Sequence, residues 1–194
     1  MSFRLCLRLG ILFMVLSALI PTAYADSWLP PKPESIYESA AKDARFIMTA
    51  TTHPGSLLAS SGSVYIKQPG TDSADWIKRW EAPLQNLPVT ALIANGGWRV
   101  ITFDSWYSAG FGDEVIVFYD ETGALLKKHS LESLLSEPEL NKVPHSVSSR
   151  WWRTKASINE TLGLLKVEVA QAEDKQRSTK PLVFDLLTGE VITP

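Results

Sequence analysis

The sequence predicts an all-β fold of stacked antiparallel sheets that resemble about three β-propeller blades, with one short helix in a loop. Short runs rich in β-branched and aromatic residues recur along the chain between turn-forming Gly, Pro, Ser and Asp. The runs at 100–103 and 115–119 are continuously apolar, which indicates strands covered on both faces. A weak internal repeat places Thr-Gly turns at equivalent positions. Sheets stacked between sheets would satisfy all three observations.

The first 25 residues are typical of a secretory signal peptide. Arg4 and Arg8 are its only charges, and an apolar run follows over 9–20. Ala23 and Ala25 form the small-residue pattern of a cleavage site. The apolar run is shorter than the about 20 residues that a transmembrane helix needs. We therefore expect cleavage after Ala25, a periplasmic or secreted protein, and no membrane span in the mature chain.

The composition of the chain argues against thiol chemistry and against two kinds of strongly anionic partner. The only cysteine, Cys6, lies inside the predicted signal, so the mature chain would have no thiol for disulfides or thiolate chemistry. Removal of Arg4 and Arg8 with the signal lowers the formal net charge from −2 to about −4. The sequence contains no basic stripe, which argues against nucleic acid or an anionic membrane surface as the partner.

After the signal, the chain is predicted to form an N-terminal arm and one β domain. The arm, 26–43, is proline-rich at its start and is expected to be extended, with a short helical stretch over 35–42. In the domain, 44–194, the connection 95–97 reads Asn-Gly-Gly and predicts a tight hairpin. The runs with strand character are 44–51, 63–68, 76–82, 89–94, 99–105, 114–120, 124–130, 147–154, 162–170, 180–187 and 190–193.

One helix is expected between these strands. Ser130 is a suitable N-cap, and Leu131, Leu134 and Leu135 would lie on one apolar face. Pro138 lies just beyond them and would mark the end of the helix. The stretch 137–146 is then predicted to be a loop, and a further helical turn within it stays open.

The internal repeat aligns 117–126 with 183–192 through Val-Phe and Thr-Gly at equal spacing. In this alignment Gly123 and Gly189 each supply a turn residue with positive φ. Antiparallel units that recur every about 40–50 residues are typical of propeller blades, but propellers usually need at least about four blades to close. Three architectures therefore stay open: an open stack, a closed assembly of several chains, and a sandwich that only imitates blades.

Residues 98–153 carry a series of motifs in a fixed order. A Thr-Phe-Asp strand end leads into an aromatic-rich Gly-x-Gly-Asp link, an apolar strand, an Asp/Gly turn, a leucine-rich short helix and a Trp-Trp strand. In these motifs the chain resembles a class of uncharacterised secreted bacterial proteins with propeller-like repeats. The resemblance implies the architecture but no activity, so it carries over no catalytic residue.

The connection 103–115, FDSWYSAGFGDEV, is the first candidate for a binding site. It is longer than the about two to five residues of an ordinary hairpin, and long loops often carry function. Asp104 and Asp113 are expected to accept backbone N–H bonds in its turns. Its aromatic residues either form a stacking platform for a sugar ring or a peptide side chain, or pack onto the end of a sheet. These aromatic residues are Trp106, Tyr107 and Phe111.

A second candidate region contains His145 and the tandem tryptophans 151 and 152. His145 lies in a proline-flanked loop. Neighbouring residues in a strand point to opposite faces, so one tryptophan is expected in the core and the other at a second surface. We name Trp152 as the contact candidate of the pair.

Catalytic, metal and cofactor sites are not predicted. The nucleophile elbow G-x-S-x-G is absent, and the histidines at 53, 129 and 145 lack metal-ligand spacing. Adjacent carboxylates such as Asp113 and Glu114 would face opposite ways in a strand, so they cannot act together as the acid and base of a glycosidase.

The leading hypothesis is a non-enzymatic binding or interaction module of the bacterial envelope. Its contact surface would comprise the loops 104–113 and 136–146, and its partner would be an envelope protein or a glycan. Two alternatives stay open. One is a periplasmic hydrolase or carbohydrate-active enzyme whose residues converge only in the fold. The other is a structural protein that completes its sheets as a homo-oligomer.

Overall fold

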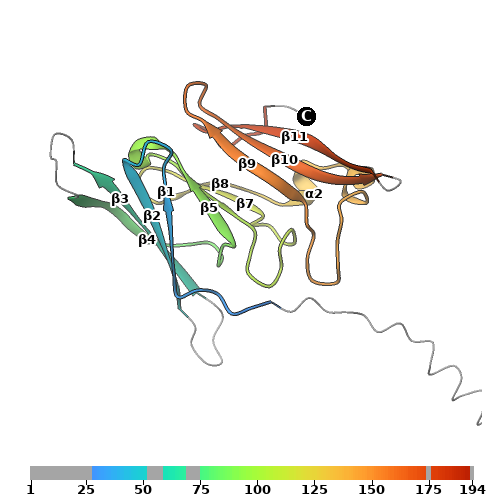
Figure 1. The fold of residues 1–194 in the computed structure, drawn as a ribbon, viewed down its shortest axis with the longest axis horizontal. Helices are drawn as coiled ribbons and strands as arrows, with labels where there is room; N and C mark the ends of the chain where they lie inside the picture. Colours follow the sequence, from blue (N-terminus) through green and yellow to red (C-terminus); the bar gives the residue numbers. More distant parts are fainter. Residues whose placement is uncertain (1–27, 52–58, 69–74, 174–175, 193–194) are drawn as a thin grey trace, which may run out of the picture.

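The computed structural model describes residues 28–51, 59–68, 75–173 and 176–192, which form three antiparallel β-sheets and two short α-helices (Figure 1). The prediction of an all-β fold with antiparallel sheets is confirmed at this level. Each sheet consists of strands that are consecutive in the chain. The predicted signal peptide and its cleavage site lie outside the described residues. Within those residues, no helix has the length and apolar character needed to cross a membrane.

The first sheet contains, in this order, β1 (Glu34–Glu38), β2 (Ala44–Thr51), β3 (Ala59–Lys67) and β4 (Trp76–Pro83). The helix predicted over 35–42 is wrong, because residues 34–38 form the edge strand β1. Pairing with β2 places Tyr37 opposite Phe46, and their rings stack with centroids 6.1 Å apart. This cross-strand contact outweighs the weak local helical pattern.

The second sheet contains, again in chain order, β5 (Thr90–Ile93), β6 (Val100–Phe103), β7 (Ile116–Tyr119) and β8 (Leu125–His129). β5 and β6 form the predicted hairpin, but the link is longer than a tight turn because it contains the short 3-10 helix η1 (Asn95–Gly97). Gly96 and Gly97 have φ values of 66° and 68°, which turn the chain back. The connection 104–115 joins β6 to β7.

The third sheet has the order β11 (Gln176–Asp185), β10 (Leu164–Glu173), β9 (Arg153–Asn159). Two predicted strands are corrected. The run 147–154 becomes a strand only at Arg153, because the residues before it form a turn closed by a bridge between His145 and Arg150. Of the run 190–193, the described part forms only an isolated bridge, which pairs residue 191 with residue 184 of β11.

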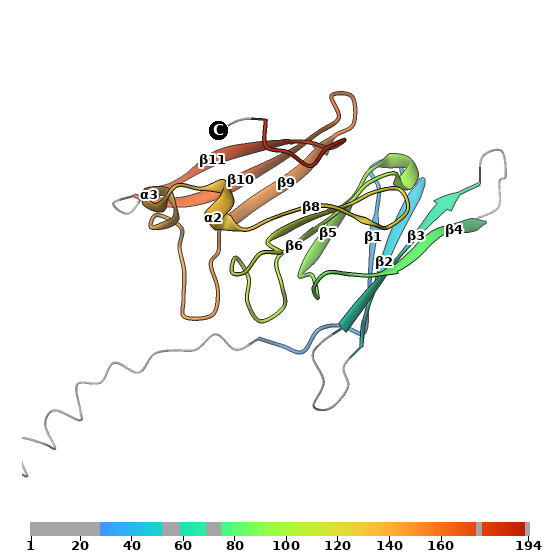
Figure 2. The same ribbon diagram turned by 180° about the vertical axis from the view of Figure 1, so that it is seen from behind.

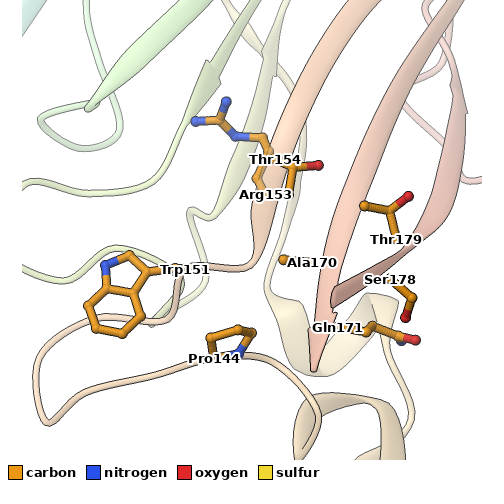
Figure 3. Close-up of a pocket in the computed structure, with 8 residues that line it drawn as sticks. All are labelled: Pro144, Trp151, Arg153, Thr154, Ala170, Gln171, Ser178 and Thr179. Carbon is orange, nitrogen blue, oxygen red and sulfur yellow. The ribbon is translucent and has the colours of Figure 1, made fainter. Parts of the chain in front are cut away.

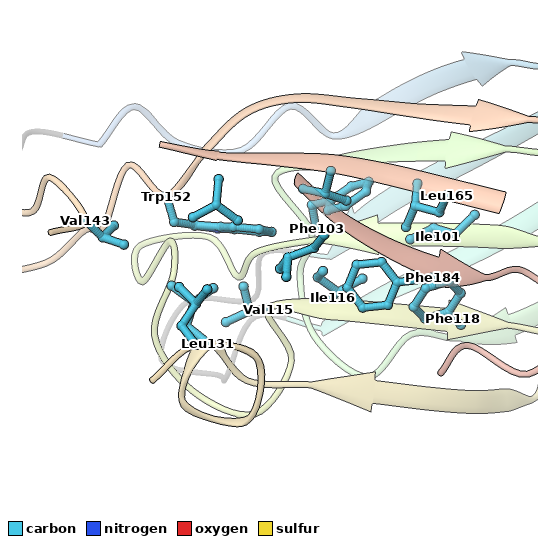
Figure 4. Packing of buried hydrophobic residues seen from close by; sticks show 14 of the residues in the cluster. Ile101, Phe103, Val115, Ile116, Phe118, Leu131, Val143, Trp152, Leu165 and Phe184 are labelled. Atoms are coloured by element: carbon cyan, nitrogen blue, oxygen red, sulfur yellow. The ribbon is translucent and has the colours of Figure 1, made fainter. Parts of the chain in front are cut away.

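The second sheet lies between the other two and is covered on both faces (Figures 1 and 2). On the side of the first sheet, the buried hydrophobic side chains of β6 and β7 are Val100, Val117 and Tyr119, and the buried Thr102 pairs across the strands with Val117. On the side of the third sheet, they are Ile101, Phe103, Ile116 and Phe118 (Figure 4). Every residue of both strands is buried, so the double coverage predicted from their continuous apolar runs is confirmed.

Two helices follow β8, where the sequence predicts one. α2 (Leu131–Leu134) is capped as predicted, since the hydroxyl of Ser130 accepts the N–H of Ser133 at 3.1 Å. α3 (Glu137–Leu140) forms in the stretch where the sequence predicted a loop and left a further helical turn open. Pro138 lies in its first turn instead of beyond a helix, and proline is tolerated there because no intrahelical N–H bond is needed.

Glu139 anchors α3 to the third sheet. Its carboxylate accepts the N–H of Ser136 at 2.9 Å and pairs with Lys180 of β11 at 2.7 Å. The hydrogen bond from Lys180, together with those from Ser136, lowers the pKa of Glu139 to about 2. Because the folded pKa lies below the ordinary value of 4.5, this stabilisation is fully present above pH 4.5 and is lost as the pH falls toward 2.

The two Thr-Gly turns of the internal repeat both place glycine in the left-handed region, as predicted. The φ value is 84° at Gly123 and 73° at Gly189. Gly123 also lies against the ring of Trp80, where an added Cβ would come within 2.6 Å of a ring carbon. The turn between β7 and β8 therefore packs closely onto the first sheet because it lacks a side chain at this position.

We expect Gly123→Ala to destabilise the protein by about 3 kcal/mol, from backbone strain and displacement of the Trp80 ring. The control is Gly96→Ala. Gly96 also has positive φ, but nothing lies within 4 Å of an added Cβ, so about 1 kcal/mol of strain is expected. Chemical unfolding of the two variants measures the difference. Equal losses of stability would show that contact with Trp80 imposes no constraint.

Glu139→Gln is expected to lower the stability at neutral pH and to reduce the further loss of stability between pH 4.5 and pH 2. The amide does not titrate and cannot form the ion pair with Lys180. Urea unfolding midpoints across this pH range test the expectation. Glu137→Gln is the matched control, because Glu137 is exposed in the same helix and has no ion pair among the described residues. If the urea midpoints of both variants fell equally between pH 4.5 and pH 2, the role of the Glu139–Lys180 ion pair would be contradicted.

Candidate functional site

Three segments gather at one end of the sheet stack: 28–33, the connection 104–115 and the segment 141–152 (Figure 1). We call this region the loop end. The N–H of Arg150 donates to the carbonyl of Ala109 at 2.8 Å, which joins the second segment to the third. The predicted loop 104–113 is therefore a neighbour of a segment that contains only residues 141–146 of the other predicted loop, 136–146, because residues 137–140 form α3.

Asp104 fixes the start of the connection 104–115. It is 5% exposed and has a φ of 62°. Its Oδ1 accepts the N–H of Gly110 at 2.9 Å and Nε1–H of Trp152 at 2.6 Å. Its Oδ2 lies 3.5 Å from Nη2 of Arg153. One buried carboxylate thus closes the connection on itself and ties it to the start of the third sheet.

Burial dominates the electrostatics of Asp104. Desolvation raises the pKa of its carboxyl group, while the hydrogen bond from Trp152, the charge of Arg153 and the N–H of Gly110 oppose that rise. Both oxygens already have partners inside the protein. The primary role of Asp104 is therefore to anchor the structure of the loop end.

The three aromatic residues of the connection do not form one continuous platform. Trp106 is half-buried, its Nε1–H donates to a carbonyl of the segment 28–33 at 3.0 Å, and its ring centroid lies 5.6 Å from that of Trp28. Phe111 lies beneath the guanidinium of Arg150 at 4.4 Å. Tyr107 is 44% exposed. Of the two predicted alternatives, a stacking platform and packing onto a sheet end, packing applies to Trp106 and Phe111. The ring of Tyr107 is accessible to a partner.

Asp113 and His145 are exposed, and neither belongs to the network of contacts around Asp104. Asp113 is near the far end of the connection, which Asn86 holds together by donating to the carbonyls of Asp104 and Glu114 at 2.9 and 3.0 Å. Nδ1 of His145 contacts a nearby backbone carbonyl at 3.1 Å. Neither side chain shares a hydrogen bond or ion pair with Asp104 in the described part of the chain. The predicted polar site residues therefore do not converge on one centre.

The tandem tryptophans divide as predicted, one into the core and one toward solvent. Trp152 is 1% exposed and Trp151 is 54% exposed. The contact candidate named from the sequence, Trp152, is thus the buried member, and Trp151 is the surface residue that sequence reasoning missed. Alternation cannot tell which ring turns inward. The hydrogen bond of Trp152 to Asp104, 48 residues earlier, decides it.

Two neighbouring hollows flank Trp151. The first, which we call the Trp151 hollow, has a volume of about 360 Å³ and lies between the segment 141–152 and the end of the third sheet (Figure 3). Its lining includes Pro144, Trp151, Arg153, Gln171, Ser178 and Thr179. The second, which we call the arm hollow, has a volume of about 230 Å³. Its lining includes Trp28, Asp104, Trp151, Trp152 and Arg153. Trp151 and Arg153 therefore line both.

Among the residues that the structure describes, no three or more His, Cys, Asp or Glu side chains come close enough together to hold a metal ion. Comparison of the chain with protein-family models, with curated proteins and with solved structures finds no match in any of the three. The geometry of the loop end is therefore the basis on which a function is assigned.

We expect Asp104→Ala to destabilise the protein by about 3 kcal/mol, because it removes the acceptor of two buried N–H groups and the partner of Arg153. Asp113→Ala, in the same connection but at an exposed position, should change the stability by less than about 0.5 kcal/mol. Urea unfolding compares the two variants, and near-ultraviolet circular dichroism reports the environment of Trp152. Equal stability of both variants would contradict the anchoring role of Asp104.

Proposed function

We propose that the protein is a non-enzymatic binding module of the bacterial envelope that contacts its partner through the loop end. The observation that carries this proposal is the grouping of large, exposed apolar side chains on that region. Their exposed fractions are 81% for Leu29, 44% for Tyr107, 76% for Val147 and 54% for Trp151. Apolar side chains that cluster on one exposed surface are typical of interaction sites.

Backbone hydrogen bonds fix the chain at or beside two of these residues, Tyr107 and Trp151. The N–H of Trp106 donates to the carbonyl of Leu87, and the N–H of Trp151 donates to the carbonyl of Pro144, both at 2.8 Å. Asp104 adds the buried contacts described above. Loops that are fixed on a rigid sheet scaffold are a common location of binding residues.

The predicted signal peptide supports the envelope as the location of this module. With cleavage after Ala25, Trp28 would lie within the first few residues of the mature chain, and its ring contacts those of Trp106 and Tyr107. The partner in this proposal is an envelope protein or a glycan.

The finer architecture that we propose is an open stack of three propeller-like blades. Each sheet is an antiparallel meander in chain order. The second sheet packs against the first on one face and against the third on the other, as blades do.

The chemistry of the hollows favours binding over the alternative of a hydrolase. An acid and base pair for glycoside hydrolysis would need two carboxylates facing one site. Among the described residues that line the two hollows, Asp104 is the one carboxylate. Its oxygens are held by Gly110, Trp152 and Arg153.

The proposed binding role is tested by affinity capture from a bacterial envelope extract, with purified residues 26–194 as bait. We expect a protein that is retained by the wild type, and identified by mass spectrometry, to be lost from Tyr107→Ala/Trp151→Ala. The double variant removes the two exposed aromatic rings of the loop end.

The matched control for this capture is Leu162→Ala/Leu187→Ala. These two leucines are 64% and 70% exposed, in the turns after β9 and β11 at the opposite end of the third sheet. Circular dichroism verifies the folding of each variant. If the loop-end variant captured the same proteins as the wild type and the control, the assignment of this surface would be wrong.

A further inference from the structure

The Trp151 indole forms one side of the Trp151 hollow (Figure 3), and the backbone of Trp151 is held by two neighbouring contacts. Its backbone N–H donates to the carbonyl of Pro144 at 2.8 Å. The next residue, Trp152, is locked in the core by its bond to Asp104. Trp151 therefore presents a 54% exposed ring from a fixed backbone position, which reduces the backbone entropy lost when a ligand stacks on it.

Across from Trp151, the hollow is lined by Ala170 and Gln171 of β10 and by Ser178 and Thr179 of β11 (Figure 3). The register pairs Ala170 with Thr179 and Gln171 with Ser178, so the side chain of Thr179 lies on the opposite face of the third sheet from those of Gln171 and Ser178. Among the described residues, the side chains of these three polar residues make no hydrogen bond. Each of them offers both a donor and an acceptor at this end of the sheet. A sugar ring is complementary to this arrangement, because it presents an apolar C–H face to an aromatic ring and hydroxyl groups at its rim.

Arg153 adds a positive charge to the lining that the two hollows share. Its guanidinium is held over the ring of Phe103 at 4.5 Å. The oxygen of Asp104 lies 3.5 Å from Nη2, which is longer than an ordinary charge-assisted hydrogen bond. Since a guanidinium carries several N–H donors, this single contact leaves donors available within the described part of the chain. A carboxylate on the ligand would be a suitable acceptor for them.

The adjacent arm hollow extends the site beyond a single ring. It shares Trp151 and Arg153 with the Trp151 hollow, whose volume of about 360 Å³ falls in the range of small-molecule sites, roughly 300–1,000 Å³. We propose that these two hollows bind an acidic oligosaccharide, an inference that rests on the binding role proposed above. One sugar ring stacks on Trp151, and a carboxylate of the sugar pairs with Arg153.

Calorimetric titration of the purified protein with two tetrasaccharides, one of uronic acids and one of neutral hexoses, tests this inference. We expect the uronic acid tetrasaccharide to bind more tightly. Trp151→Ala should weaken its binding about tenfold or more through loss of stacking. Ser178→Ala/Thr179→Ala should weaken it to a smaller degree, because both side chains are exposed and their removal leaves the core intact. Leu162→Ala/Leu187→Ala should bind like the wild type.

Equal affinity for the two tetrasaccharides would overturn the assignment of Arg153, and binding that survives Trp151→Ala unchanged would overturn the stacking. If neither sugar binds, while affinity capture yields a protein partner that depends on Tyr107 and Trp151, the oligosaccharide inference fails and the binding role stands. If neither sugar binds and no partner is captured, both fail.

Discussion

The fold depends on a central sheet that has no face in water. All residues of β6 and β7 are buried, half of them against the first sheet and half against the third. Each fully buried aliphatic or aromatic side chain contributes about 1.5–3 kcal/mol relative to an exposed one, so the central sheet is stable only while both neighbours cover it. The outer sheets have one covered face each, which is why buried residues alternate along β2.

This constraint also shapes the loop end. β6 ends at Phe103, and the next residue, Asp104, binds the side chain of Trp152 at the start of the third sheet. The loop end is thus continuous with the core between the second and third sheets. Trp151 is one residue away from that core, which explains how it is both firmly held and open to solvent.

Features of the fold that depend on neighbouring residues along the chain could be predicted from the sequence. The bounds of β2, 44–51, agree with the predicted run, and the continuous apolar runs gave the double coverage of the central sheet. Features set by distant partners were not readable. Trp152 turns inward because it bonds Asp104. Of the two predicted alternatives, packing applies to Trp106, which bonds the segment 28–33, and to Phe111, which lies against Arg150. No local pattern reports such contacts, so the sequence could not show which of the two tryptophans is exposed.

The chain order of the three sheets has a consequence for biogenesis. A chain that emerges with its N-terminus first can complete the first sheet and pair it with the second before β9 to β11 are available. Until then, the other face of the central sheet, with Ile101, Phe103, Ile116 and Phe118, has no cover. Such an apolar face attracts other incomplete chains. Packing of the third sheet therefore covers this face and ends the stage of synthesis in which it is exposed.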